Sequence, residues 1–142
     1  MQDKHLKTNI GQYAVIIKDK KVLMLCPPNG PLWIYPGGRI NEKDTDYKEA
    51  LKREIYEELN LNINILEPID VQMWSTNDND HRYGVFFLCE LIDNIKKIRL
   101  SKEHSKHEWF SYEELIEHYS KEPIRAKPGI TVANKLREKN II

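Results

Sequence analysis

The feature that most constrains this chain is an acidic segment at residues 37–61, with the sequence GGRINEKDTDYKEALKREIYEELNL. Residues three and four positions apart are neighbours on a helix, so Glu54, Glu57 and Glu58 share one face. Three apolar side chains recur every fourth residue and form a stripe on another face: Leu51, Ile55 and Leu59. We therefore expect a helix that the stripe anchors and that presents its carboxylates in one direction.

Clustered carboxylates repel one another, at a cost of about 0.2–0.5 kcal/mol for each like-charged pair on an exposed helix. Arg53 supplies only one positive charge in this segment. Mg²⁺ binds proteins through a few carboxylates together with substrate phosphates, so it could neutralise the cluster. The alternative is a solvated acidic face without a ligand, which is the usual meaning of a charged run. The three glutamates alone leave both interpretations open.

Signals at both ends place the helix at residues 47–59. Asp46 followed by Glu49 is a capping-box pattern. Asn60 follows the last apolar position, where a left-handed residue ends many helices. The preceding Pro36-Gly37-Gly38 predicts a turn that brings backbone close to the acidic face. Such a turn on such a helix would form a cradle for a metal ion and a diphosphate.

These residues resemble the signature of the Nudix hydrolases, G-x5-E-x7-R-E-U-x-E-E-x-G-U, where U is a bulky apolar residue. The matching positions are Gly38, Arg53, Glu54, Ile55, Glu57, Glu58 and Leu61. Residues 32–38, LWIYPGG, look like the strand and turn that precede the signature in this family. The resemblance implies an α/β protein with the Nudix fold, an α/β/α sandwich with a mixed sheet between helices. It implies one Nudix hydrolase domain over residues 1–142.

The chain departs from the signature in three ways. The first Glu of the signature falls on Asp44 when counted from Gly38 and on Thr45 when counted from Arg53. The loop is therefore one residue longer than the signature has it. Asn60 stands where the family has Gly, which is a mild change because Asn tolerates the left-handed conformation. In the family the missing Glu mainly supports the loop, whereas the carboxylates that bind metal are all matched.

The resemblance implies a metal-dependent pyrophosphohydrolase that cleaves a diphosphate linked to another group, with Mg²⁺ as cofactor and Mn²⁺ as the second option. The implied metal ligands are Gly38, Glu54, Glu57 and Glu58. The implied catalytic residues are Arg53, Glu57, Glu58 and Glu103, with Glu58 and Glu103 both open as the base. The implied substrate-binding residues are Gly37, Gly38 and Arg39. Arg39 could pair with a substrate phosphate or with the helix carboxylates.

Two further groups of residues could contact a ligand. His104 and His107 invite a zinc interpretation, but zinc sites need three or four protein or water ligands, so we expect surface histidines. Four aromatic residues could stack on a nucleobase, although such residues more often belong to the core: Trp33, Tyr35, Trp74 and Tyr83.

Composition limits the partners. The 22 Lys and Arg residues balance the 22 Asp and Glu residues, so no strong positive charge favours nucleic acid. No apolar run is long enough for a signal peptide or a membrane span. We expect a cytoplasmic protein whose partner is a small nucleotide or another diphosphate compound. Whether it forms a homodimer stays open.

The remaining apolar runs predict further elements. Residues 12–18 and 22–26 form a hairpin around Asp19-Lys20, and their continuous apolarity predicts helices on both sides of the sheet. The other expected strands are 32–35, 63–74 with a break at Pro68, 83–91 and 108–110, and the other expected helices are 112–119, capped by Ser111, and 130–139. Residues 1–11 are expected to be an arm or an edge strand, and residues 75–82, 92–107 and 123–129 are expected to connect the elements.

Two other functions remain open from the sequence. A non-catalytic nucleotide-binding module is compatible with the missing first Glu. An RNA 5′-end pyrophosphohydrolase would use a local group of basic residues: Lys96, Lys97, Arg99 and Lys102. Positions where some Nudix subfamilies carry a Pro or a Tyr fall at residues 76–78, which have neither. A nucleoside di- or triphosphate is the expected substrate class.

Overall fold

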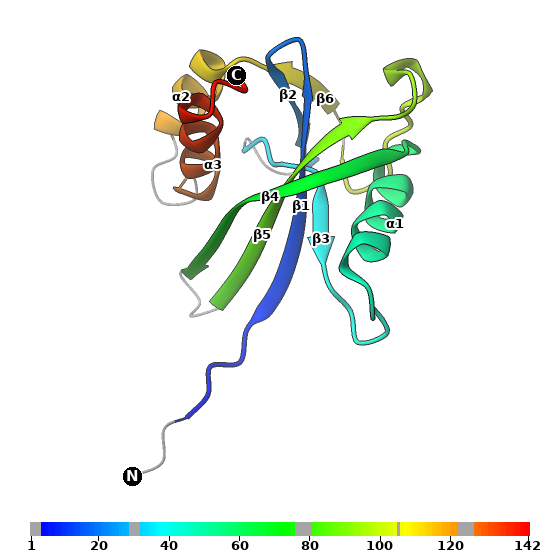
Figure 1. Cartoon of the computed structure of the whole chain (residues 1–142), viewed down its shortest axis with the longest axis vertical. Coiled ribbons are helices and arrows are strands. Elements are labelled where there is room, and N and C mark those ends of the chain that lie inside the picture. The colour runs from blue at the N-terminus through cyan, green and yellow to red at the C-terminus, as the bar shows by residue number, and fades with distance from the viewer. Residues whose placement is uncertain (1–3, 29–31, 76–80, 105, 122–126) are drawn as a thin grey trace.

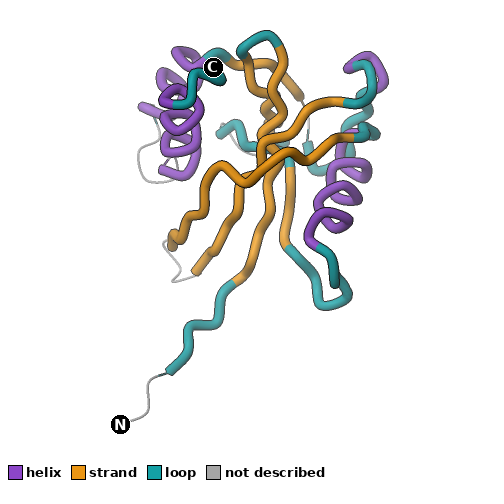
Figure 2. The backbone as a smooth tube through the Cα atoms, viewed as in Figure 1, coloured by secondary structure: helices purple, strands orange, loops and turns teal. Residues whose placement is uncertain are grey.

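The computed structural model describes residues 4–28, 32–75, 81–104, 106–121 and 127–142. Its strands are β1 (Asn9–Lys18), β2 (Lys21–Cys26), β3 (Gly37–Arg39), β4 (Ile63–Ser75), β5 (His81–Leu91) and β6 (Lys106–Phe110). Its helices are α1 (Tyr47–Leu59), α2 (Tyr112–Ser120), α3 (Lys127–Glu138) and the short 3₁₀ helix η1 (Ile95–Lys97). Figure 2 shows how the strands cross the middle of the molecule between the helices.

The strands form one mixed sheet in the order β4-β5-β1-β2-β6, with β3 paired to β1 beside this path. β1 runs parallel to β5, and the other pairs are antiparallel. One edge of β1 serves two partners in turn: residues 11–13 pair with β3, and residues 17–18 pair with β2. The sheet therefore forks along β1, and β3 leaves the fork toward α1 (Figure 1).

Alternate residues of β1 point into two separate cores, as strand geometry requires. Ala14 and Ile16 pack with the apolar stripe of α1. Val15, between them, packs with residues of α2 and α3. Figure 1 shows α1 on one side of the sheet and the α2–α3 pair on the other. The expected α/β/α sandwich with a mixed sheet is confirmed.

Helix α1 has the bounds that its sequence predicts. The Asp46 side chain accepts hydrogen bonds from the backbone N–H groups of Lys48 and Glu49, as an N-cap does. Asn60 is left-handed, with φ 58°, and its N–H donates to the Tyr56 carbonyl. Leu51, Ile55 and Leu59 are all buried. The carboxylates on the other face are therefore held by a well-anchored helix.

The predicted strand at residues 32–35 is wrong. Only Ile34 bridges to Leu25, and the strand β3 lies instead in the predicted glycine turn. The reason is the close approach of two backbones: a Cβ on Gly37 would collide with the Gln12 carbonyl, and Gly37 has φ 148°. Glycine is favoured at such a position because it lacks a side chain.

Three boundaries also differ from expectation. Residues 9–11 belong to the central strand β1 and not to an edge strand, since the N-terminal half of β1 pairs with both β3 and β5. β6 begins at Lys106, inside the expected connection. α3 begins at Lys127 and includes Pro128, which the first turn of a helix tolerates. Parts of two expected connections, residues 76–80 and 122–126, lie outside the described residues.

Other local predictions are confirmed. Asp19 and Lys20 form the hairpin turn, both with positive φ. Register shifts flank Pro68 in β4, and Ser111 with Glu114 forms a capping box at α2. Helices long and apolar enough to cross a membrane are absent from the described parts of the chain.

Candidate functional site

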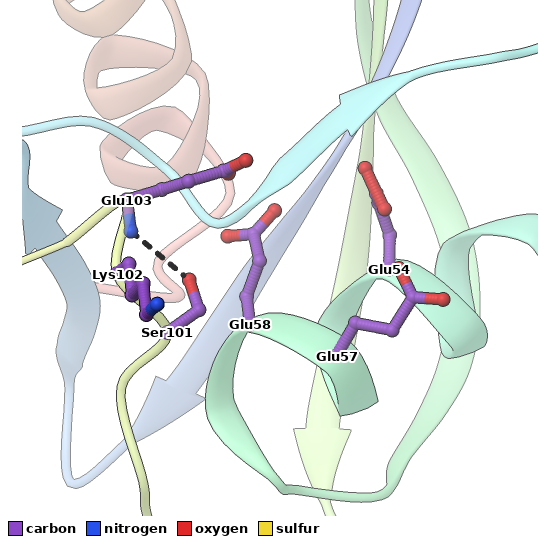
Figure 3. A pocket seen from close by; sticks show the side chains of 6 residues that line it. All are labelled: Glu54, Glu57, Glu58, Ser101, Lys102 and Glu103. Carbon is purple, nitrogen blue, oxygen red and sulfur yellow. Dashed lines mark hydrogen bonds between the residues drawn. The ribbon is translucent and has the colours of Figure 1, made fainter.

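The acidic face of α1 forms a pocket with the turn that precedes β6. The lining residues are Glu54, Glu57, Glu58, Ser101, Lys102 and Glu103 (Figure 3). Two backbone hydrogen bonds fix the turn to the helix end, because the N–H groups of Arg99 and Ser101 donate to the carbonyls of Leu59 and Glu58, each at 2.9 Å. These bonds satisfy carbonyls that a helix end leaves open. They also hold Glu103 beside the helix.

The four carboxylates of the pocket differ in exposure. The Glu58 residue is 5% exposed, whereas the Glu57 side chain is 60% exposed. Glu54 is half-buried and Glu103 is exposed. Figure 3 shows Glu103 reaching from its turn toward Glu58, with Glu54 and Glu57 on the far side of Glu58. The pocket thus has a buried carboxylate at its centre and more exposed ones around it.

Strand β3 passes close over this acidic face because it begins with two glycines. A Cβ on Gly38 would collide with the carboxylate of Glu54. The backbone of Gly37 hydrogen-bonds the Glu58 carboxylate and lowers its pKa. The cradle of glycine backbone on an acidic helix, which the sequence predicts, therefore exists as a strand rather than as a turn.

Burial and mutual repulsion act on the central carboxylates. Burial raises the pKa of Glu54, and the charges of Glu58 and Glu57 raise it further. Burial also raises the pKa of Glu58, against the opposing effects of His104 and the Gly37 backbone. The Oε2 atom of Glu58 is buried and lies 3.1 Å from Nε2 of His104. A buried carboxylate is costly unless its charge is compensated, and a hard divalent cation would compensate it.

A chain of charged groups connects the loop before α1 to the helix. Nη1 of Arg53 lies 2.5 Å from Oδ1 of Asp44, and Nε of Arg53 lies 3.6 Å from Oε1 of Glu57. Asp44 also accepts a hydrogen bond from the backbone of Asn41 at 2.9 Å. The bond from Arg53, and then that from Asn41, lowers the pKa of Asp44. Asp44 thus gives the loop the support that the resemblance ascribes to the missing Glu.

Arg39 and the two histidines considered for zinc lie outside the group of α1 carboxylates. Arg39 is exposed at the end of β3, and the described ion pairs include none between it and the α1 carboxylates. His104 was expected at the surface, and this prediction is wrong because its side chain is only 7% exposed and Nε2 lies 3.1 Å from Oε2 of Glu58. His107 is exposed, as expected. In the sequence, the feature that could have pointed to His104 as a site residue is its position directly after Glu103.

The four aromatic residues do not gather at one place. Tyr35 is buried and donates a hydrogen bond to the Gly129 carbonyl, and Trp33 packs edge-on against Phe110. Trp74 lies against Tyr13. Trp74 pairs with Arg82 across the sheet, so Tyr83 points to the opposite face. A single aromatic platform made of these four side chains is therefore excluded.

One group of side chains meets the spacing that a metal ion requires. Ligand atoms of Glu58, Glu103 and His104 all lie within 4.8 Å of one another. With the carboxylate of Glu54, which lies against Gly38, the donor set is mostly carboxylate oxygen. Such a set suits Mg²⁺ or Mn²⁺. The residues present therefore fit a divalent cation.

Comparison with known proteins agrees with this geometry. A family model described as NUDIX domain matches residues 7–130. A NUDIX hydrolase from Nitrosomonas europaea superposes with a TM-score of 0.77 at 19% identity, covering 94% of this chain and 90% of the other. A MutT protein from Methanosarcina mazei Go1 gives a TM-score of 0.74 at 20% identity, covering 96% and 99%.

A third solved structure, a binary complex of an Ap4A hydrolase from C. elegans, gives a TM-score of 0.71 at 20% identity. The alignment covers 92% of this chain and 96% of that chain. Comparison with curated proteins gives no significant match. At these identities the solved structures show the fold alone, while the family model covers most of the sequence.

Proposed function

The chain belongs to the Nudix family, whose members hydrolyse phosphoric anhydride bonds, and we propose that its substrate is a nucleoside di- or triphosphate or a related diphosphate-linked nucleotide. The observation that carries the proposal is the acidic pocket of α1, with Glu54 against Gly38 and the buried Glu58 at its centre. The fold shared with an Ap4A hydrolase supports a nucleotide substrate.

We assign the metal ligands to the carboxylates of Glu54, Glu57 and Glu58 and to the backbone carbonyl of Gly38. When bound there, Mg²⁺ or Mn²⁺ would neutralise the charge of the diphosphate, which is the main requirement of phosphoryl transfer. Arg53 holds Glu57 in place, because it bonds both Glu57 and the loop residue Asp44.

Glu103 is our choice for the base that takes a proton from the attacking water. Its carboxylate is exposed at the rim of the pocket, where water and substrate can reach it. Glu58 is the weaker choice because it is buried and next to His104. As the proton moves to Glu103, the water oxygen bonds to phosphorus and the bond from phosphorus to the bridging oxygen breaks.

The substrate phosphates would lie against the glycine backbone of β3. Gly37 and Gly38 have no side chains that would block this approach. Arg39 follows them, is exposed, and has no ion pair with the helix carboxylates within the described residues. It is therefore available to pair with a phosphate.

A substrate panel with Mg²⁺, read by the release of phosphate and pyrophosphate, tests the proposed substrate class. We expect release from one or more nucleoside di- or triphosphates or diphosphate-linked nucleotides. Release from none of these compounds, with tight nucleotide binding, would favour a binding module. Release only from triphosphorylated or capped RNA would favour RNA 5′-end processing.

The variant Glu57→Gln tests the metal site. Loss of one metal ligand removes several kcal/mol of transition-state stabilisation, so we expect kcat to fall by about 10³-fold. Glu49→Gln is the matched control, since Glu49 lies on the same helix, is exposed, and pairs with Lys52 at the surface. Circular dichroism should show both variants folded. Turnover by Glu57→Gln close to that of wild type would exclude Glu57 from the metal site.

A further inference from the structure

His104 and Glu58 form a buried pair at the floor of the pocket. Their side chains are 7% and 6% exposed, and Nε2 of His104 lies 3.1 Å from Oε2 of Glu58. Neither the expected metal ligands nor the expected catalytic residues include this histidine. Because polar side chains are rarely this buried without a partner, the pair needs an explanation.

The two side chains face each other through Nε2 of His104 and Oε2 of Glu58. The other ring nitrogen, Nδ1 of His104, is buried without a hydrogen-bond partner among the residues that the structure describes. The backbone of His104 is fixed separately, by a 3.3 Å hydrogen bond from its N–H to the Ser101 carbonyl. The ring therefore stands on a fixed turn with one nitrogen directed at one carboxylate oxygen.

The chemistry of imidazole suits a support for a metal-binding carboxylate. A neutral imidazole can donate one N–H to a carboxylate without adding a positive charge beside the cation. Lysine or arginine in the same place would bring a full charge that competes with the cation. The stiff ring also restricts the orientation of the Glu58 carboxylate, because an ordered Glu side chain loses rotamer freedom.

Resting on the proposed function, and deepening it, we propose that His104 is a positioning residue that holds Glu58 in the orientation required to bind the divalent cation. Nε2–H of His104 would support Oε2, leaving the rest of the carboxylate for the cation. Outer partners of metal ligands typically change metal affinity or activity by about 10–100-fold when removed. His104 acts through Glu58 and is not itself assigned to the metal or the substrate.

The test compares His104→Gln with His104→Leu, because the Gln amide can place an N–H donor near the position of Nε2 and Leu cannot. Binding of Mn²⁺ is measured by electron paramagnetic resonance, together with kcat and KM. We expect His104→Leu to weaken Mn²⁺ binding by about 10–100-fold and His104→Gln to retain most of the affinity. His107→Leu, on the exposed part of β6, is the matched control and should bind Mn²⁺ as wild type does.

Thermal unfolding and circular dichroism accompany each variant. Should His104→Leu fail to fold, His104→Asn replaces it, since its shorter side chain cannot reach Oε2, and the same weakening is expected. Unchanged Mn²⁺ affinity in a folded Leu or Asn variant would overturn the proposal. An equal loss in the Gln and Leu variants would also overturn it, because the donor would then not be what matters.

The outcomes separate this proposal from the proposed function. If wild type binds no Mn²⁺, the metal site fails and both proposals fall together. If wild type binds Mn²⁺ but all His104 variants bind it equally well, only the role of His104 is wrong.

Discussion

At the scale of single residues, Asp44 shows how a departure from a family signature can be accommodated. The longer loop brings this shorter acid to Arg53, and its side chain is only 6% exposed there. Arg53 in turn contacts Glu57 in the pocket. The support of the loop and the placement of a proposed metal ligand therefore depend on the same guanidinium.

We expect Asp44→Asn to lower the melting temperature at pH 7, because the variant loses the charged partner of Arg53. The hydrogen bonds from Arg53 and Asn41 lower the pKa of Asp44. Ionised Asp44 thus stabilises the fold above the pKa of an unfolded Asp, and this contribution is lost as the pH falls through the lower folded pKa. The gap between wild type and variant should narrow in the same range.

Thermal denaturation across a pH series checks this prediction. Asp46→Asn is the control, because Asn caps a helix about as well as Asp and should leave the melting temperature nearly unchanged. Equal melting temperatures for wild type and Asp44→Asn at pH 7 would show that the ion pair adds nothing to stability.

The residue scale also shows the limit of prediction from sequence. Glu54, Glu57 and Glu58 could be placed together because helix periodicity is local. Counting along the loop placed the first Glu of the signature on either Asp44 or Thr45. The sequence could therefore not show that Asp44 contacts Arg53. The burial of His104 could not be foreseen, because it depends on where the turn at residues 99–104 meets the end of α1.

At the scale of elements, the C-terminal end of α1 is hydrogen-bonded to the segment that leads to Glu103. Asn60 ends the helix in the left-handed conformation, and its side chain donates a hydrogen bond to the Lys97 carbonyl at 3.1 Å. The family signature has Gly at this position, and the Asn here adds a side-chain contact that Gly lacks.

We expect Asn60→Ala to lower the free energy of unfolding by about 1–2 kcal/mol, because Ala is strained in the left-handed conformation. Asn60→Gly should lose less, since Gly adopts this conformation readily and gives up only the bond to Lys97. Urea unfolding measures both values. A Gly variant that is less stable than the Ala variant would mean that the bond to Lys97, and not the backbone conformation, matters most.

Elements with local signals were predictable, and those that depend on distant pairing were not. The helix α1 has caps and periodicity within its own sequence, and the hairpin of β1 and β2 has two apolar runs around a short polar turn. By contrast, β3 forms because Gly37 lets the chain pass close to Gln12 and Tyr13 of β1. The apolar run at residues 32–35 had the stronger strand propensity, yet it makes only an isolated bridge.

At the scale of the whole molecule, burial and mutual repulsion of the carboxylates in the acidic pocket lower the stability of the metal-free protein at neutral pH. Burial and neighbouring charges raise the pKa values of Glu54 and Glu58. In the folded protein these carboxyls hold protons more tightly than in the unfolded chain. Stability therefore falls as the pH rises from the ordinary Glu pKa through the raised folded pKa, and the loss is complete above it.

We therefore expect Glu54→Gln to raise the melting temperature of the metal-free protein at pH 7. This gain should shrink as the pH falls toward the ordinary Glu pKa, where the wild-type carboxyl is neutral in both states. Thermal unfolding in EDTA across this pH range measures it. A metal-free variant that melts below wild type at pH 7 would contradict the prediction.

Added Mn²⁺ should reverse the order of the two proteins. A ligand at 100 times its dissociation constant stabilises the folded state by about 2.7 kcal/mol, so wild type should gain melting temperature. Glu54→Gln should gain much less at the same concentration. An equal shift in both proteins would place the bound Mn²⁺ away from Glu54.

The central strand β1 sends alternate side chains into two cores that share little packing. Substitutions beneath α2 and α3 therefore act mainly on contacts that the acidic helix does not use, and effects at such separated sites tend to add independently. An engineer could therefore repack the core beneath α2 and α3, for instance to raise heat tolerance, without redesigning the helix that carries the acidic pocket.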